Sequence, residues 1–169
     1  SIMRIGEKLD TGPVCNSYKI NIMADDNSET IAEKLSKLAS EKILDNIDKI
    51  LEDKIEFKEQ NHKDATYAAK IEKKEGQIEW RETAEKIIGK INGLYPSPGA
   101  FFVYNGERYK ILKASLALGS GKIGEVLDNY LEVGCGDKKS IKILEIQRQG
   151  KRPQNIGEFM LGSQIKKGS

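Results

Sequence analysis

The chain has 169 residues, of which 38% are hydrophobic and 32% are charged, and its formal net charge is +2. Its mean hydropathy is −0.54, and no segment approaches the roughly 18–20 apolar residues that a membrane-spanning helix needs. This composition argues against a membrane protein and against a wholly disordered chain, and it allows one ordinary domain or two small ones.

The charge is divided unevenly along the sequence. Residues 83–169 carry 14 Lys and Arg against 8 Asp and Glu, whereas residues 1–82 carry 14 against 18. A basic half attracts polyanions, of which nucleic acid is the commonest, although a solvated lysine face gives the same count. The two cysteines, Cys15 and Cys135, form no Cys-x-x-Cys motif, so we expect free thiols in the reducing cytoplasm and no metal site.

The first twenty residues predict two strands, at 2–5 and 14–22, joined by a turn that contains Leu9-Asp10-Thr11-Gly12. The chain starts without Met and almost at once enters a strand that needs neighbours. We therefore expect it to be a piece of a longer protein. Asp-Thr-Gly is also the aspartic protease signature, but Pro13 after the glycine and the helical pattern that follows argue against it. Taken alone, the motif favours an aspartate that caps a turn.

A long amphipathic helix is predicted from the cap-rich segment 25–28 to about Asp53, with Thr30 and Glu33 matching a capping box. Its apolar residues recur at helical spacing, which is typical of a helix that covers a sheet. Residues 57–82 then have the composition of a partly ordered linker. We expect Tyr67, Ile71, Ile78 and Trp80 to anchor it along a surface.

The remainder, residues 83–169, has the pattern of short strands and turns that is typical of a small β domain. A short helix opens at Thr83 and runs to about Ile91, and Asn105-Gly106 between apolar runs predicts a hairpin of strands 100–104 and 108–114. Further strands are expected at 124–127, 130–135 and 140–147, followed by a last helix at about 155–161. Five short, closely spaced strands indicate a barrel or sandwich.

Basic side chains gather in this half. Arg108 and Lys110 share a face of one predicted strand, and strict alternation places Lys113 on the other. The loop 147–153 carries the densest cluster, with Arg148, Lys151 and Arg152. Five-stranded barrels of the oligonucleotide-binding (OB) kind bind nucleic acid through a strand face and loops. These six residues are therefore candidate phosphate contacts.

Four segments in order resemble the C-terminal part of the methionyl-tRNA formyltransferase family. They are Ile2-Met3-Arg4 leading to Leu9-Asp10-Thr11-Gly12-Pro13-Val14; the 28–51 helix; Gly93-Leu94-Tyr95-Pro96-Ser97-Pro98-Gly99-Ala100-Phe101 with Tyr109-Lys110-Ile111-Leu112-Lys113-Ala114; and Leu144-Glu145-Ile146-Gln147-Arg148-Gln149-Gly150-Lys151-Arg152-Pro153. The resemblance runs from the first residue almost to the last.

The resemblance implies an α+β chain in three parts. Residues 1–56 would be the remnant of a Rossmann-like α/β formyltransferase domain, 57–82 the linker, and 83–169 an OB-like five-stranded barrel that binds tRNA. The full-length enzyme, expected to be a cytoplasmic monomer, would transfer formyl from 10-formyltetrahydrofolate to initiator methionyl-tRNA without a metal.

The same resemblance makes Asp10 the catalytic aspartate, supported in its turn by Thr11 and Gly12. The family's aspartate acts with an asparagine and a histidine that lie upstream of this chain, so we expect the fragment alone to be inactive. Lys8 stands where the family usually has glycine, which puts the placement of Asp10 in doubt. Two alternatives stay open: a stand-alone nucleic-acid-binding module, and a related folate-dependent formyltransferase that acts on folate itself or on nucleotide sugars.

Overall fold

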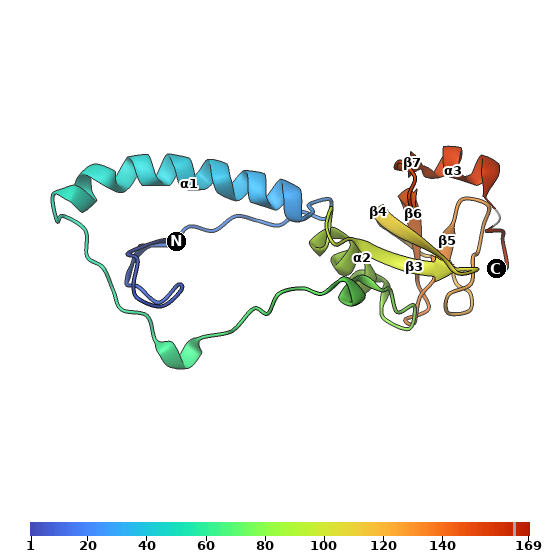
Figure 1. The fold of residues 1–169 in the computed structure, drawn as a ribbon, viewed down its shortest axis with the longest axis horizontal. Helices are drawn as coiled ribbons and strands as arrows, with labels where there is room; N and C mark the ends of the chain where they lie inside the picture. The colour runs from blue at the N-terminus through green and yellow to red at the C-terminus, as the bar shows by residue number, and fades with distance from the viewer. Residues whose placement is uncertain (164) are drawn as a thin grey trace. The chain divides into compact units, whose positions relative to one another are not determined.

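The computed structural model describes residues 1–163 and 165–169, and its contacts divide the chain into two compact units (Figure 1). The first unit comprises Ser1–Asp26 and Thr30–Lys70, and the second comprises Asn27–Glu29 and Ile71–Ser169. The predicted linker, 57–82, spans the boundary at residues 70 and 71. The three-part division proposed from the sequence stays a prediction.

In the first unit a two-stranded hairpin, β1 (Ile2–Met3) and β2 (Val14–Asn16), encloses the Asp-Thr-Gly turn. Both strands are shorter than predicted. A two-stranded ribbon without further partners has little to keep it extended, and Ile5, for example, is fully exposed. A single bridge joins Val14 to Lys58. This hairpin and one helix do not by themselves establish a Rossmann-like architecture, which stays a prediction.

The long helix is confirmed as α1 (Ser28–Leu51). It begins before the predicted capping box, and the Asn27 side chain accepts from the Glu29 amide at 3.0 Å. Thr30 instead donates to the carboxylate of Asp26. The apolar stripe is partly uncovered, since Leu35, Ile43 and Ile47 are 46%, 39% and 37% exposed. None of the described helices is long and apolar enough to cross a bilayer.

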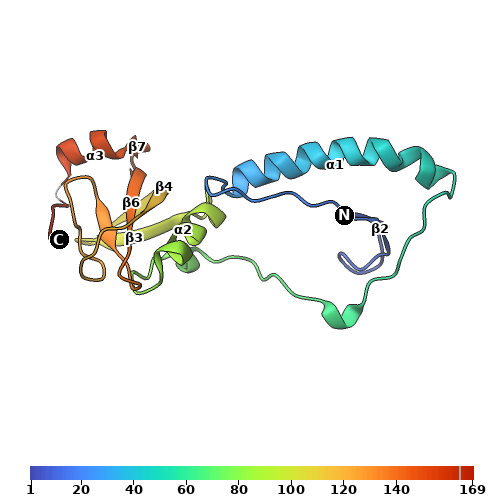
Figure 2. The ribbon, with the colours of Figure 1, turned by 180° about the vertical axis from the view of Figure 1, so that it is seen from behind.

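The second unit consists of a curled antiparallel sheet with helices beside it (Figures 1 and 2). Its strands are β3 (Ala100–Tyr104), β4 (Glu107–Ala117), β5 (Glu132–Gly134), β6 (Ser140–Arg148) and β7 (Gln154–Asn155). The helices of this unit are α2 (Ala84–Gly93) and α3 (Ile156–Gly162). The short 3-10 helix η2 (Lys73–Gly76) precedes them in this unit, and another, η1 (His62–Asp64), belongs to the first unit. The strand order is β3-β4-β6-β5, and β7 pairs with β6.

The predicted start of α2 and the predicted β3–β4 hairpin are confirmed, and both depend on contacts between residues close in sequence. The Thr83 side chain caps α2 by accepting from the Lys86 amide. Asn105 and Gly106 have φ of 49° and 78°, the left-handed pair that a tight two-residue hairpin turn requires. Tyr104 accordingly pairs directly with Glu107 across the turn.

The predicted strand at 124–127 is wrong. In this segment an isolated bridge joins Val126 to Val133, and the left-handed conformations of Gly124 (φ 78°) at its start and of Leu131 (φ 59°) beyond its end limit the extended chain. The unpredicted β7 supplies the fifth strand instead. Along the described residues no pairing joins β3 to β5, the two ends of the strand order. A closed OB-like barrel therefore stays a prediction.

A single apolar core holds this unit together. Ile87 and Ile91 of α2 are fully buried beside Ile143 of the sheet. Ile78 and Trp80 belong to the predicted linker but pack on this core, with Trp80 5.9 Å from Phe102. The other two expected anchors are wrong, since Tyr67 and Ile71 are 96% and 51% exposed.

Candidate functional site

The turn that carries Asp10 is shaped by its own backbone and by one distant side chain. Asp10 has a φ of 55°, a left-handed conformation that Asp tolerates better than most residues. The Thr11 hydroxyl donates to the carbonyl of Lys8 at 2.9 Å. The Gln60 amide donates to the carbonyls of both Asp10 (2.9 Å) and Gly12 (2.7 Å). Sequence reasoning missed Gln60, because no local pattern links it to a turn fifty residues earlier.

Gly12 is required by close packing. It is buried, and a Cβ there would overlap the carbonyl oxygen of Arg4, whose amide donates to the carbonyl of Pro13 at 3.0 Å. The turn is thus held at both ends, and Asp10 is left exposed between them. Its carboxylate takes no hydrogen bond from any described residue.

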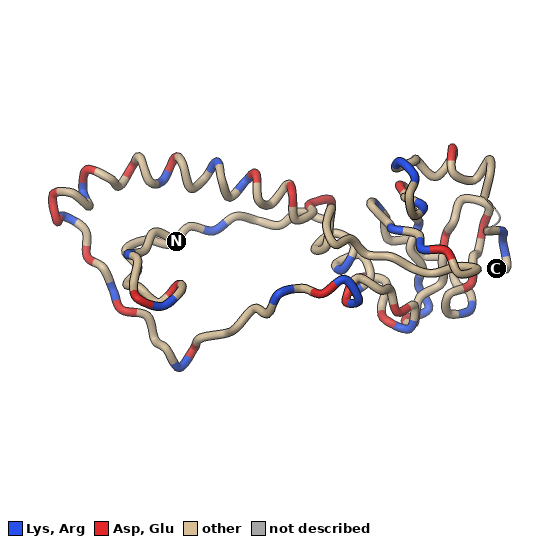
Figure 3. The backbone as a smooth tube through the Cα atoms, viewed as in Figure 1, with Lys and Arg blue, Asp and Glu red and all other residues tan. Residues whose placement is uncertain are grey.

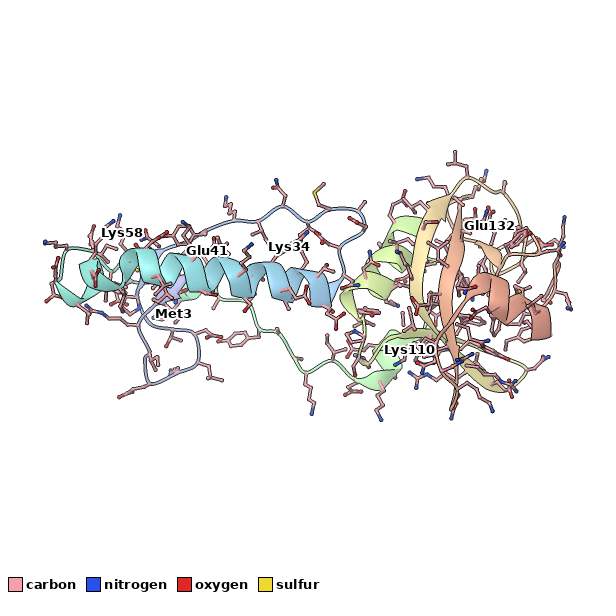
Figure 4. The ribbon with its side chains drawn as sticks, turned by 90° about the horizontal axis from the view of Figure 1, so that it is seen from above. Met3, Lys34, Glu41, Lys58, Lys110 and Glu132 are labelled. Atoms are coloured by element: carbon pink, nitrogen blue, oxygen red, sulfur yellow. The ribbon has the colours of Figure 1, made fainter. Side chains whose placement is uncertain are left out.

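In the second unit, three of the six predicted basic residues line one groove of about 380 Å³. Arg108 and Lys110 of β4 and Arg148 of β6 are joined there by Lys73 of η2. Figure 4 labels Lys110 beside the sheet, and Figure 3 shows the Lys and Arg positions along the chain. Lys73 was missed because it precedes the β domain in sequence and approaches only through the η2 turn.

Each of these cations is held differently. The Arg108 guanidinium lies over the Phe101 ring, with Cζ 3.6 Å from the ring centroid. The Lys110 ammonium donates to the carbonyl of Pro96 at 3.4 Å, and its stem crosses Gly99. Polar groups of Gln147 and Gln149 complete the wall. The groove therefore offers several cations, of which Arg108 and Lys110 are held by contacts within the unit, and this suits a phosphate backbone.

Arg148 is committed to an ion pair with Glu107. The second oxygen of that carboxylate accepts from the hydroxyl of the buried Tyr109 at 2.8 Å. Arg148, and then Tyr109, hold the pKa of Glu107 below its usual range. Burial, with the Glu107 carboxylate beside it, raises the pKa of Tyr109. Arg148 thus reaches the groove already partly neutralised.

The other predicted basic residues lie elsewhere. Lys151 and Arg152 line a second hollow, of about 570 Å³, between the β3–β4 hairpin and α3, and Arg148 borders both hollows. Lys113 does not take the core side that strict alternation assigns to it. The register shifts between Ile111 and Lys113, so Ala114 packs on the core and Lys113 is exposed opposite Glu145.

No described residues form a group able to hold a metal ion. Both cysteines are free thiols. Cys135 is buried in the core, and this burial raises the pKa of its thiol to about 11.

The second unit, with its curled antiparallel sheet, corresponds to the C-terminal domain of a formyltransferase-type chain. The family model "Formyl transferase, C-terminal domain" matches residues 70–164, and the chain belongs to this family. It is 69% identical over all 169 residues to a methionyl-tRNA formyltransferase of Pelagibacter ubique (strain HTCC1062), of which it covers 54%. It is 34% identical to that of Bradyrhizobium diazoefficiens over 99% of its length, covering 55% of the relative. The chain thus spans about half the length of these relatives.

Solved structures share the fold at low identity. HypX from Aquifex aeolicus in complex with tetrahydrofolic acid aligns with a TM-score of 0.73 and 16% identity, covering 98% of this chain and 30% of that one. Methionyl-tRNA formyltransferase from Clostridium thermocellum aligns with a TM-score of 0.53 and 21% identity, covering 83% of this chain and 53% of that one.

Proposed function

We propose that this chain is the C-terminal part of an enzyme that transfers a formyl group from 10-formyltetrahydrofolate to the amino group of initiator methionyl-tRNA. The observation that carries the proposal is the 69% identity to a methionyl-tRNA formyltransferase over the whole of this chain. We further propose that the complete enzyme acts as a monomer in the cytoplasm.

Asp10 is the catalytic residue in this proposal. The folate co-substrate supplies the formyl group. An exposed carboxylate at the apex of a fixed turn can keep a neighbouring imidazole charged or pass a proton through water. Thr11 and Gly12, together with Gln60, position it. The partner groups and most of the folate pocket would come from the part of the enzyme outside this chain, so the chain alone is expected to be inactive.

The second unit docks the tRNA in this proposal, as an OB-like barrel. Arg108, Lys110 and Arg148, with Lys73, would contact phosphates through the first groove, and Lys151 and Arg152 through the second hollow. Lys113 would add an exposed charge on β4. Such contacts give an affinity that falls steeply with salt and varies little with sequence.

The test is a chimera in which this chain replaces the matching C-terminal 54% of the Pelagibacter ubique relative. With 10-formyltetrahydrofolate and charged initiator tRNA, the chimera should formylate methionyl-tRNA. Asp10→Asn should lower kcat about 100-fold or more, the usual contribution of an acid–base group, and leave tRNA affinity unchanged. Asp53→Asn is the matched control, because Asp53 is an exposed aspartate of the same unit with a similar φ of 51°.

Two results would contradict the proposal. An N-formyltransferase from Helicobacter canadensis in complex with folinic acid and dTDP-3-aminofucose shares the fold (TM-score 0.68, 19% identity, covering 86% of this chain and 54% of that one). Formylation of that amino sugar in place of methionyl-tRNA would favour the related-transferase alternative. Binding of RNA by a chimera that transfers no formyl group would favour a nucleic-acid-binding module.

A further inference from the structure

Arg108 differs from the other cations of the groove in how its guanidinium is held. Its Cζ lies 3.6 Å from the centroid of the Phe101 ring, which is the contact distance of two carbon atoms. A guanidinium standing on edge at that height would drive a nitrogen into the ring. The two planar groups are therefore stacked face to face.

The ring beneath the guanidinium is fixed. Phe101 is only 8% exposed, and its carbonyl accepts from the Ile78 amide at 2.8 Å. Gly76 also packs against the ring, since a Cβ there would come within 3.4 Å of Phe101 Cδ1. The backbone of Arg108 is fixed as well, since it pairs with Val103 and its carbonyl accepts from the Gln149 amide at 3.0 Å.

The second face of the guanidinium is turned to the groove. Arg108 lines the groove together with Lys110 and Lys73, whereas Phe101 lies beneath it and does not line it. Among the described residues Arg108 makes no ion pair with a carboxylate, in contrast to Arg148, which is paired with Glu107. The groove thus contains a flat, charged, half-buried surface together with two lysines.

We infer that Arg108 stacks on an unpaired nucleobase of the bound RNA, while Lys110 and Lys73 contact the adjoining phosphates. Arginine planes stack readily on the faces of unpaired bases, and a paired base within a duplex offers no such face. The inference deepens the proposed function and rests on its tRNA-binding part. It makes the ligand of this groove a single-stranded segment of the RNA.

The informative variant is Arg108→Lys, which keeps the positive charge and removes the plane. Phe101→Leu removes the platform beneath it, and Trp80 fluorescence, which reports on the neighbouring core, verifies that each variant is folded. Lys110→Met is the matched control for a phosphate contact from the same strand.

Binding of the whole chain is measured against salt with two probes. One is a single-stranded RNA that contains 2-aminopurine, and the other is a blunt RNA duplex of equal length. Arg108→Lys should weaken single-strand binding about 5- to 150-fold, the loss of one stacked base. The salt slope and the duplex affinity should stay unchanged, and the fluorescence change of bound 2-aminopurine should disappear. Lys110→Met should weaken both probes and reduce the salt slope by about one.

The outcomes separate the two proposals. Equal weakening of both probes by Arg108→Lys, or no weakening of either, would overturn the stacking role and leave tRNA binding standing. Failure of the unmodified chain to bind either RNA would refute the tRNA-docking proposal and the stacking role with it.

Discussion

Gly99 connects the stability of the second unit with the shape of its groove. Its φ is 81°, a conformation that L residues rarely adopt, and a Cβ there would lie 2.5 Å from Cδ and 2.7 Å from Cε of Lys110. Gly99→Ala therefore introduces backbone strain and displaces the lysine stem. The left-handed conformation costs an L residue about 1–2 kcal/mol. The contact adds less, because a lysine stem can move.

We expect Gly99→Ala to lower the free energy of unfolding by about 1–2 kcal/mol, which corresponds to a Tm lower by roughly 4–16 °C for a domain of this size. Trp80 is the only tryptophan of the chain and lies in this unit, so its fluorescence follows the relevant transition. RNA affinity should fall as well, since displacement of the stem moves the ammonium of Lys110.

A double-mutant cycle separates the two effects. Lys110→Ala removes the stem, so in that background Gly99→Ala should retain the backbone strain and lose the contact. Its effect on RNA affinity should also disappear there. The reasoning would be refuted if Gly99→Ala left the Tm unchanged or raised it in the Lys110→Ala background, because the left-handed φ would then carry no cost.

Three further predictions follow from the charges and thiols. Glu107→Gln should release Arg148 from its ion pair and strengthen its contact with phosphate, which raises RNA affinity and steepens the salt slope by up to about one; an unchanged slope would contradict this. The ion pair with Lys34 and the hydrogen bond from the Met23 amide lower the pKa of Asp26 from 3.8 to about 2. The ionised carboxylate therefore stabilises the folded chain fully above pH 3.8, and this stabilisation is lost as the pH falls from 3.8 to about 2. Urea unfolding followed by circular dichroism should show the deficit of Asp26→Asn shrinking over that interval, and a constant deficit would contradict it. Cys135, with its pKa raised to about 11, should resist a thiol reagent at pH 8 until the chain unfolds, and fast labelling in the folded chain would show that it is not buried.

Three predictions that depended on neighbouring residues were confirmed. The 24-residue α1 follows from apolar spacing, the start of α2 from the Thr83 side chain, and the β3–β4 hairpin from Asn105-Gly106. Each of these is decided within a few residues of the chain, where backbone preference and hydrogen bonding act. The sequence resemblance likewise pointed to the family that the comparison confirms.

Features that depend on pairing between residues far apart in the sequence could be seen only in the tertiary structure. The register shift near Lys113 and the replacement of segment 124–127 by β7 arise where strands meet, so no local pattern contains them. Gln60 supports the Asp10 turn from fifty residues away. The sequence by itself determined α1, the start of α2, the β3–β4 hairpin and which residues are basic. Only the tertiary structure decided that Arg148 is paired with Glu107 while Arg108 lies flat on Phe101, because such pairs are set by strand register rather than by sequence neighbours.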